Sequence, residues 1–326
     1  MPAYLVVVTI VGSGVSSLVG GLRSPSRRTA CAAIRRALVC TCSSVVLSAC
    51  GDSSKNERAP EPAPSVTLTA DERAAWGVGP PDRSSIPVLR YQSIDRERFA
   101  RHVALLSHAG YETITLEAFV RFVRRQDVPL PPRPLLLTFD GGRLDSWTRG
   151  DAILRERGFN AVIFVNVGRT ERGHPAHLTY DELDRLQASG RWDVQLQSGN
   201  AGGLIKYGPA DDDVGPFNAY RGAEEVLGGW RERVFGDISY GEEQLAHHVE
   251  GYRPLAFAPP YGNYGQAGTN DPRIPRELLP RLLLSFAVIF TQDRSAFAKA
   301  GASNPFGRID VAPDVDAAGL RALLAH

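Results

Sequence analysis

The sequence predicts an α/β fold, an irregular β/α barrel of seven or eight mostly parallel strands that follows a targeting segment and a tether. Short apolar runs bounded by Gly and Pro alternate with amphipathic stretches through most of the chain, a pattern typical of β/α units. The chain has 326 residues, of which 43% are hydrophobic, so it can bury a core of this size. It carries no glycine-rich phosphate loop, which favours a barrel over an open nucleotide-binding sheet.

The expected strands follow one another along the chain, with helices between them. Apolar residues at helical spacing predict a helix between Asp95 and Gly110. Thr179 and Glu182 form a capping-box pattern, which predicts a helix through Gln187. The expected strands are 87–91, 113–116, 135–139, 161–165, 193–197, 255–258, 287–291 and 308–311.

The first 50 residues have the layout of a secretory signal. Arg35 and Arg36 precede a mostly apolar stretch, and small residues then lead to Cys50. The Leu-Ser-Ala-Cys tetrad that ends at Cys50 resembles a bacterial lipobox, in which the cysteine receives the lipid. We therefore expect a targeting segment over 1–50, a disordered tether rich in Pro, Ser and charge over 51–80, and a barrel domain over 81–326. The protein is expected to be exported and anchored to the cell membrane as a lipoprotein.

A second uncharged run, residues 3–22, is long enough to span a bilayer. Two explanations stay open: translation could begin further downstream, since Met1 is the only methionine, or the run is a genuine additional membrane segment.

The charge of the chain is balanced. Lys and Arg number 37 against 36 Asp and Glu, a formal net charge of +1. No overall field therefore attracts a polyanion, and no nucleic-acid partner is expected.

The run from Pro134 to Gly142 predicts a buried strand that ends on one carboxylate, Asp140, followed by two glycines. In a parallel β/α barrel the residues just past each strand converge on one face, where the chemistry lies. These positions form a polar ring suited to hydrogen-bonding a hydroxylated ligand such as a sugar. The alternative is that these side chains only cap the strand ends and satisfy backbone hydrogen-bonding groups. The ring consists of Gln92, Asp140, Gln197, Pro259, Pro260, Tyr261, Gln292 and Asp293.

Aromatic residues in the glycine-rich loop over 198–222 could add to this surface. Tyr207, Phe217 and Tyr220 could stack on sugar faces, or could pack the loop onto the barrel.

Several segments, in the right order, resemble the polysaccharide deacetylase (NodB-homology) family. The run from Leu137 to Gly142 resembles the family's Thr-Phe-Asp-Asp-Gly motif, and the run from Ala258 to Gly262 resembles its Pro-Tyr-Gly motif. Segments 86–94, 109–114 and 158–165 resemble the opening strand, the stretch after the first helix and the following strand. The resemblance runs from about residue 86 to residue 311 and implies a NodB-like irregular barrel that removes N-acetyl groups from cell-surface or exported sugars.

The resemblance also implies a set of site residues. Active members hold a divalent metal with an aspartate and two histidines and use the preceding aspartate as base. Asp140 matches the base, but the metal-binding aspartate falls on Gly141. The two histidines fall on Gln197 and on Ala201 or Gly202, so all the metal positions are substituted and no metal cofactor is expected.

Three hypotheses follow. The first is a lipoprotein that binds an N-acetylated polysaccharide or another envelope glycan through a degenerate, metal-free site. The second is an active carbohydrate N-deacetylase with a site rearranged around Asp140, which would use a zinc-like divalent metal and draw on His174, His177 or Asp293. The third is a purely structural envelope protein with an empty barrel mouth. Because the family's metal ligands are absent, the first is favoured.

Overall fold

The computed structural model describes residues 58–325, except 201–202. The predicted targeting segment, Cys50 and the first part of the predicted tether lie outside the described residues. Across 58–200 and 203–325, no helix has the length and apolar character needed to cross a membrane.

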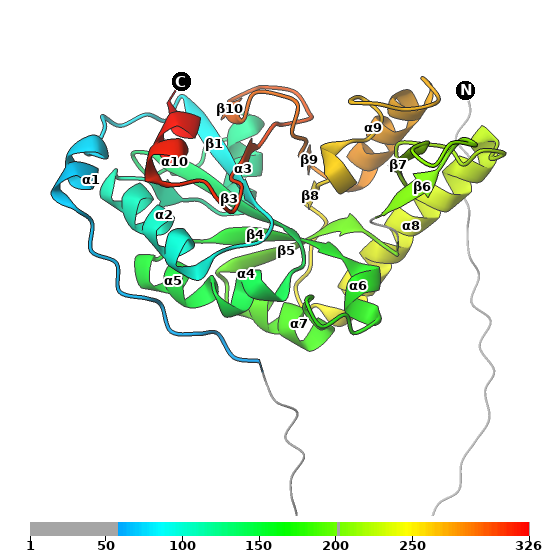
Figure 1. The fold of residues 1–326 in the computed structure, drawn as a ribbon. Helices are drawn as coiled ribbons and strands as arrows, with labels where there is room; N and C mark the ends of the chain where they lie inside the picture. The colour runs from blue at the N-terminus through cyan, green and yellow to red at the C-terminus, as the bar shows by residue number, and fades with distance from the viewer. Residues whose placement is uncertain (1–57, 201–202, 326) are drawn as a thin grey trace, which may run out of the picture. The chain divides into compact units, whose positions relative to one another are not determined.

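The domain is built around a curled, mostly parallel sheet, which confirms the predicted fold class (Figure 1). Its strands run in the order β10-β1-β3-β4-β5-β8-β9, and all neighbours are parallel except β10 and β1. A bridge between Phe290 and Phe306 links the β9 side to the segment that enters β11, and β11 pairs with β1. The strands are β1 Ser85–Tyr91, β2 Glu112–Thr113, β3 Pro134–Gly141, β4 Ala161–Asn166, β5 Trp192–Ser198, β8 Ala256–Phe257, β9 Val288–Ile289, β10 Phe297–Lys299 and β11 Ile309–Asp310.

Each predicted strand overlaps an observed one, but several are shorter than expected. The expected strand over 113–116 is only the two-residue β2, because the Thr115 side chain accepts a hydrogen bond from the Ala118 N–H and begins a helix at Leu116. The expected strands over 255–258, 287–291 and 308–311 are reduced to the two-residue β8, β9 and β11. A small hairpin, β6 Leu204–Lys206 with β7 Val214–Pro216, lies in the long loop after β5.

The helices begin where the sequence offers caps. Asp95 caps α2, and the predicted capping box at Thr179 and Glu182 is present at the start of α7. The helices are α1 Ala70–Ala75, α2 Arg96–His108, α3 Leu116–Val123, α4 Leu144–Thr148, α5 Asp151–Arg157, α6 Val167–Glu171, α7 Tyr180–Ala188, α8 Leu227–His248, α9 Ile274–Ser285 and α10 Ala317–Leu324, with a 3₁₀ turn over Pro260–Gly262.

The two faces of the sheet pack into two separate cores. On β3, Leu135, Leu137 and Phe139 belong to the core that also contains residues of α2, α5, α7 and α8, and Figure 1 shows α2, α5 and α7 along that face. Leu136 points the other way, into a smaller core with α3. Because side chains alternate along a strand, Asp140 lies on the α3 face of the sheet, at its carboxyl edge.

Residues 58–80, which composition assigns to the tether, have a structure of their own. Arg58 forms an ion pair with Glu182 at 3.2 Å, and the Glu61 N–H donates to the Thr148 carbonyl at 2.6 Å. A capping box at Thr69 starts α1. The domain's contacts therefore extend N-terminal of residue 81, because a few apolar side chains and a cap suffice to hold a segment that is poor in large apolar residues.

Candidate functional site

Asp140 ends β3 in a buried cluster of charges. Its carboxylate is 3% exposed and accepts hydrogen bonds through both oxygens. Arg308 donates to Oδ1 at 2.7 Å and to Oδ2 at 3.0 Å, and Arg90 Nε donates to Oδ2 at 2.7 Å. The Arg308 side chain is fully buried and Arg90 is nearly so. Asp140 is thus held between two guanidinium groups.

The strand register explains why these groups meet. Arg90 on β1 lies directly across from Thr138 on β3 and from Asp310 on β11. Arg308 precedes Asp310 by two positions, so both point to the same face. The Arg308 guanidinium also lies 5.4 Å from the centre of the Phe164 ring, on the neighbouring strand.

These contacts set the protonation state of Asp140. Burial by itself would raise the pKa of its carboxyl group, but the charges and hydrogen bonds of Arg308 and Arg90 outweigh burial and hold the pKa below its ordinary value. The carboxylate is therefore ionised and engaged, which makes it a weak proton acceptor.

Polar side chains close the cluster toward solvent. The remaining donors of Arg90 go to Asp310 Oδ1 at 2.5 Å and to Gln92 Oε1 at 3.2 Å. With its amide oxygen turned toward Arg90, Gln292 accepts from Nε at 2.7 Å. The positive charges of Arg90 and Arg308 are balanced by Asp140 and Asp310.

The other predicted ring residues lie at neighbouring strand ends. Gln197 and Pro260 line one small cavity at the carboxyl ends of β5 and β8. Tyr261 is 55% exposed, with a left-handed backbone at φ 60°. Asp293 is exposed on the segment after β9. Among the described contacts, Gln92 and Gln292 are the ring members that share a partner, Arg90, with Asp140, and the assignment of the ring to ligand binding stays a prediction.

His174 and His177 form a pair beside the ring. Their Nδ1 atoms are 3.1 Å apart, and His177 pairs through its backbone with Arg143. The contacts described for these histidines do not reach Asp140.

The aromatic loop residues mostly serve packing. Tyr207 and Tyr220 stack on each other with ring centres 4.7 Å apart, and the Arg233 guanidinium lies 4.3 Å from the centre of the Phe217 ring. Their flat faces are therefore largely taken up within the protein.

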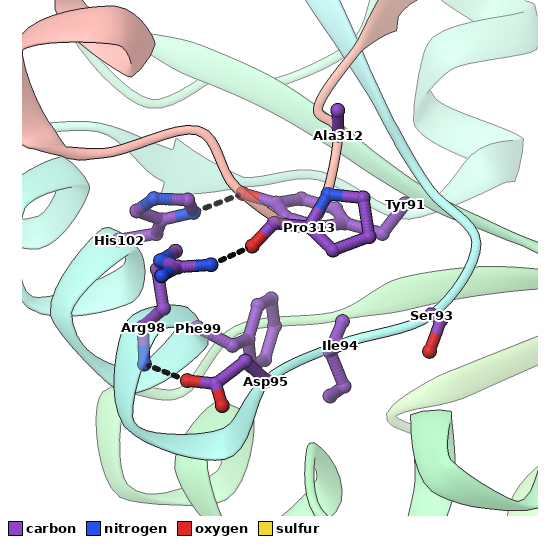
Figure 2. A pocket seen from close by; sticks show the side chains of 9 residues that line it. All are labelled: Tyr91, Ser93, Ile94, Asp95, Arg98, Phe99, His102, Ala312 and Pro313. Atoms are coloured by element: carbon purple, nitrogen blue, oxygen red, sulfur yellow. Dashed lines mark hydrogen bonds between the residues drawn. The ribbon is translucent and has the colours of Figure 1, made fainter.

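The pocket between α2 and the C-terminal segment is a structural feature. Figure 2 shows the Tyr91 hydroxyl bonded to His102 and the Arg98 side chain bonded to the Pro313 carbonyl across it. Its volume is about 10 Å³, room for at most one water. The hydrogen bonds across this pocket hold the C-terminal segment against β1 and α2.

The sequence matches the family model "Polysaccharide deacetylase" over residues 127–271. The domain belongs to the polysaccharide deacetylase family. The polysaccharide deacetylase homologue YxkH of Bacillus subtilis (strain 168) is 27% identical over 166 residues, which cover 45% of this chain. The match spans 58% of that relative's length.

Solved structures share the fold at low sequence identity. A de-N-acetylase from Aggregatibacter actinomycetemcomitans superposes with a TM-score of 0.63 at 16% identity, covering 73% of this chain and 99% of its own. IcaB from Ammonifex degensii gives 0.58 at 21% identity, covering 76% and 97%. The Streptococcus pyogenes deacetylase PplD gives 0.55 at 18% identity, covering 74% and 99%.

The described residues do not fit the divalent metal of active polysaccharide deacetylases. Gly141 offers no ligand, and both oxygens of Asp140 already accept from cationic guanidinium groups that would also repel a metal ion. Within 58–200 and 203–325, no group of three or more His, Cys, Asp or Glu residues is placed to hold a metal. The position expected for the family's second histidine, Ala201 or Gly202, lies outside the described residues.

Arg90 and Arg308 are the site residues that reasoning from the sequence missed. Both sit inside otherwise apolar strand segments, and arginine is seldom buried unless it is paired. That composition signals a buried acid nearby, but it does not identify Asp140 as the partner.

Proposed function

We propose that this protein is an exported, lipid-anchored polysaccharide deacetylase homologue that binds an N-acetylated or other envelope glycan without hydrolysing it. The observation that carries the proposal is the buried carboxylate of Asp140, which is bonded through both oxygens to Arg90 and Arg308. A base needs a free lone pair directed at the attacking water. Asp140 is buried, and three of its about four lone-pair sites already accept from cationic donors, so it is poorly placed for this role.

The energetic demand of hydrolysis supports the same conclusion. A catalytic zinc lowers the pKa of bound water from about 15.7 to about 7, which corresponds to about 12 kcal/mol in forming hydroxide at neutral pH. An ionised carboxylate with a lowered pKa does not supply that energy. With Gly141 at the family's metal-binding aspartate, no described ligand replaces it.

The barrel mouth keeps groups that suit a sugar. Gln92 and Gln292 offer amide groups beside Arg90, and the exposed ring of Tyr261 lies on the next rim loop. Amides bond sugar hydroxyls and an aromatic ring packs on the apolar face of a sugar. The solved relatives named as deacetylases, including a de-N-acetylase, motivate N-acetylated sugars as the first ligands to test.

The test measures hydrolysis and binding on the same protein. Purified full-length protein in detergent is expected to release no acetate from an N-acetylglucosamine oligomer, with or without added zinc, and to bind the oligomer saturably. Tyr261→Ala or Gln197→Ala should abolish binding, whereas Leu284→Ala, which changes a side chain 82% exposed on α9, should not. Acetate release that disappears in Asp140→Asn, together with stoichiometric metal, would establish the deacetylase alternative instead.

Export and anchoring are proposed from the lipobox at Cys50. Metabolic labelling with a fatty acid should mark the wild-type protein, and Cys50→Ser should lose the label and leave the membrane fraction. Membrane retention of an unlabelled Cys50→Ser protein would point to residues 3–22 as the anchor.

A further inference from the structure

A group of basic side chains lies on the segments that follow β3 and β4, at the same end of the sheet as Asp140. We call it the rim cluster, and its members are Arg143, Arg169, Arg172, His174 and His177; Arg169 lies on the short helix α6. Backbone hydrogen bonds hold the two segments together, from the Leu178 N–H to the Gly142 carbonyl and from the Leu144 N–H to the Ala176 carbonyl, both at 2.9 Å.

The three arginines of the rim cluster retain donors without a partner among the described residues. Arg169 is exposed, and among the described residues its guanidinium has no hydrogen-bond or ion-pair partner. Arg172 is exposed too, and its guanidinium makes one long hydrogen bond, 3.4 Å, to Asn200 Oδ1. Arg143 uses Nε for Asp145 at 3.0 Å, which leaves its terminal nitrogens available.

The acids near the rim cluster are already engaged. Asp145 accepts from Arg143 and from the Ser93 hydroxyl at 2.7 Å. Glu171 accepts from the hydroxyl groups of Tyr180, at 3.2 Å, and of Tyr240. Among the described contacts, neither carboxylate bonds Arg169.

The local charge at His177 is positive. Burial, together with the charges of His174, Arg169 and Arg143, lowers the pKa of His177 to about 4, against the opposing effect of Asp145. A divalent cation is disfavoured in such surroundings, and the histidine pair supplies only two ligands. Inside the barrel mouth, Asp140 and Asp310 balance Arg90 and Arg308, whereas Arg169 and Arg172 have no carboxylate partner among the described contacts.

We infer that the rim cluster binds anionic groups, carboxylates or phosphates, carried by the glycan, so that the ligand is an acidic polysaccharide. The inference rests on the proposed function, since it assigns a chemical class to the glycan bound at the mouth. Arg169 and Arg172 would bond the anionic groups directly, and the mouth residues would bond the neutral sugar.

The experiment compares three oligomers by calorimetry on full-length protein in detergent: neutral N-acetylglucosamine oligomers, galacturonate oligomers and glycerol-phosphate oligomers. At low salt an acidic oligomer should bind more tightly than the neutral one, and added salt should reduce the difference. Arg169→Gln or Arg172→Gln should weaken acidic binding about fivefold each, as for an exposed ion pair, and leave neutral binding unchanged. The two acidic oligomers distinguish carboxylate from phosphate.

The matched control is Arg155→Gln, an exposed arginine on α5, which runs toward the start of β4 and away from the mouth. It should alter no affinity. Equal binding of neutral and acidic oligomers, unaffected by the rim variants, would overturn the inference and leave the proposed function standing. Rim variants that weaken binding only to phosphatidylglycerol vesicles would replace the glycan with a membrane surface. If no oligomer binds the wild-type protein, the proposed function and the inference both fail.

Discussion

Replacing Asp140 with asparagine removes the negative charge that two buried guanidinium groups share. The side chain keeps its shape, so the change isolates charge from packing. Arg90 retains Asp310 and Gln92 as partners, but Arg308 is fully buried and its other described side-chain partner is Thr138, at 3.4 Å. The effect therefore falls mainly on Arg308.

The expected loss is large for one substitution. Breaking a buried ion pair by neutralising one partner costs about 3–5 kcal/mol in the free energy of unfolding. A domain of this kind has about 5–15 kcal/mol in total, so Asp140→Asn should lose a substantial fraction of its stability. An acid kept only for catalysis would behave differently, because substitutions away from such networks change stability by about 0.5 kcal/mol or less.

Urea unfolding followed by tryptophan fluorescence and circular dichroism measures the difference. The matched control is Asp293→Asn, an exposed acid that follows another strand, and it should leave the unfolding midpoint unchanged. A double-mutant cycle with Arg308→Gln should give a coupling of about 1–3 kcal/mol, since the two side chains are in direct contact.

The pH dependence provides a second check. Because Arg308 and Arg90 lower the pKa of folded Asp140, its contribution is present above the pKa of the unfolded chain and is lost as the pH falls through the lower, folded pKa. The gap between wild type and Asp140→Asn should therefore close below about pH 4. An Asp140→Asn protein as stable as wild type at neutral pH would refute the buried charge cluster.

Three further outcomes follow from the structure. His102 is 2% exposed, and burial lowers its pKa to about 4. The free energy of unfolding of the wild type should therefore fall by up to about 3 kcal/mol as the pH falls from about 6.5 to 4, and His102→Gln should reduce this pH dependence. Gly141→Asp should bind no stoichiometric zinc in metal analysis and should lose about 1–2 kcal/mol in urea, because its φ is +93°; stoichiometric zinc would contradict the poor fit to a metal. In α8, the methyl group added by Gly236→Ala meets open space, so this variant should be about 0.5–1 kcal/mol more stable to unfolding. The methyl group added by Gly241→Ala would lie 2.6 Å from Leu196 Cδ1, so this variant should have a lower midpoint of thermal unfolding. If both variants changed stability in the same direction, the packing of α8 on β5 would be contradicted.

Local patterns predicted much of the fold because the features that carry them are local. The capping box at Thr179 and the run from Leu135 to Phe139 each depend on a few adjacent residues, and both are present in the structure. The strands β8, β9 and β11 are shorter than predicted, because the length of a strand depends on how many residues pair with neighbours that are distant in the sequence. The helix at α1 was missed because its cap lies in a stretch whose average composition predicts a tether.

The sequence by itself determined that one acid, Asp140, stands at the carboxyl end of a buried strand and that glycine occupies the next position. Only the tertiary structure decided what that acid does, because its partners lie 50 and 168 residues away along the chain. The register of β1 with β3 and β11 brings the two arginines to one face, and no local pattern encodes that register. The carboxylate that resembles the base of polysaccharide deacetylases thus lies at the centre of a buried ion cluster.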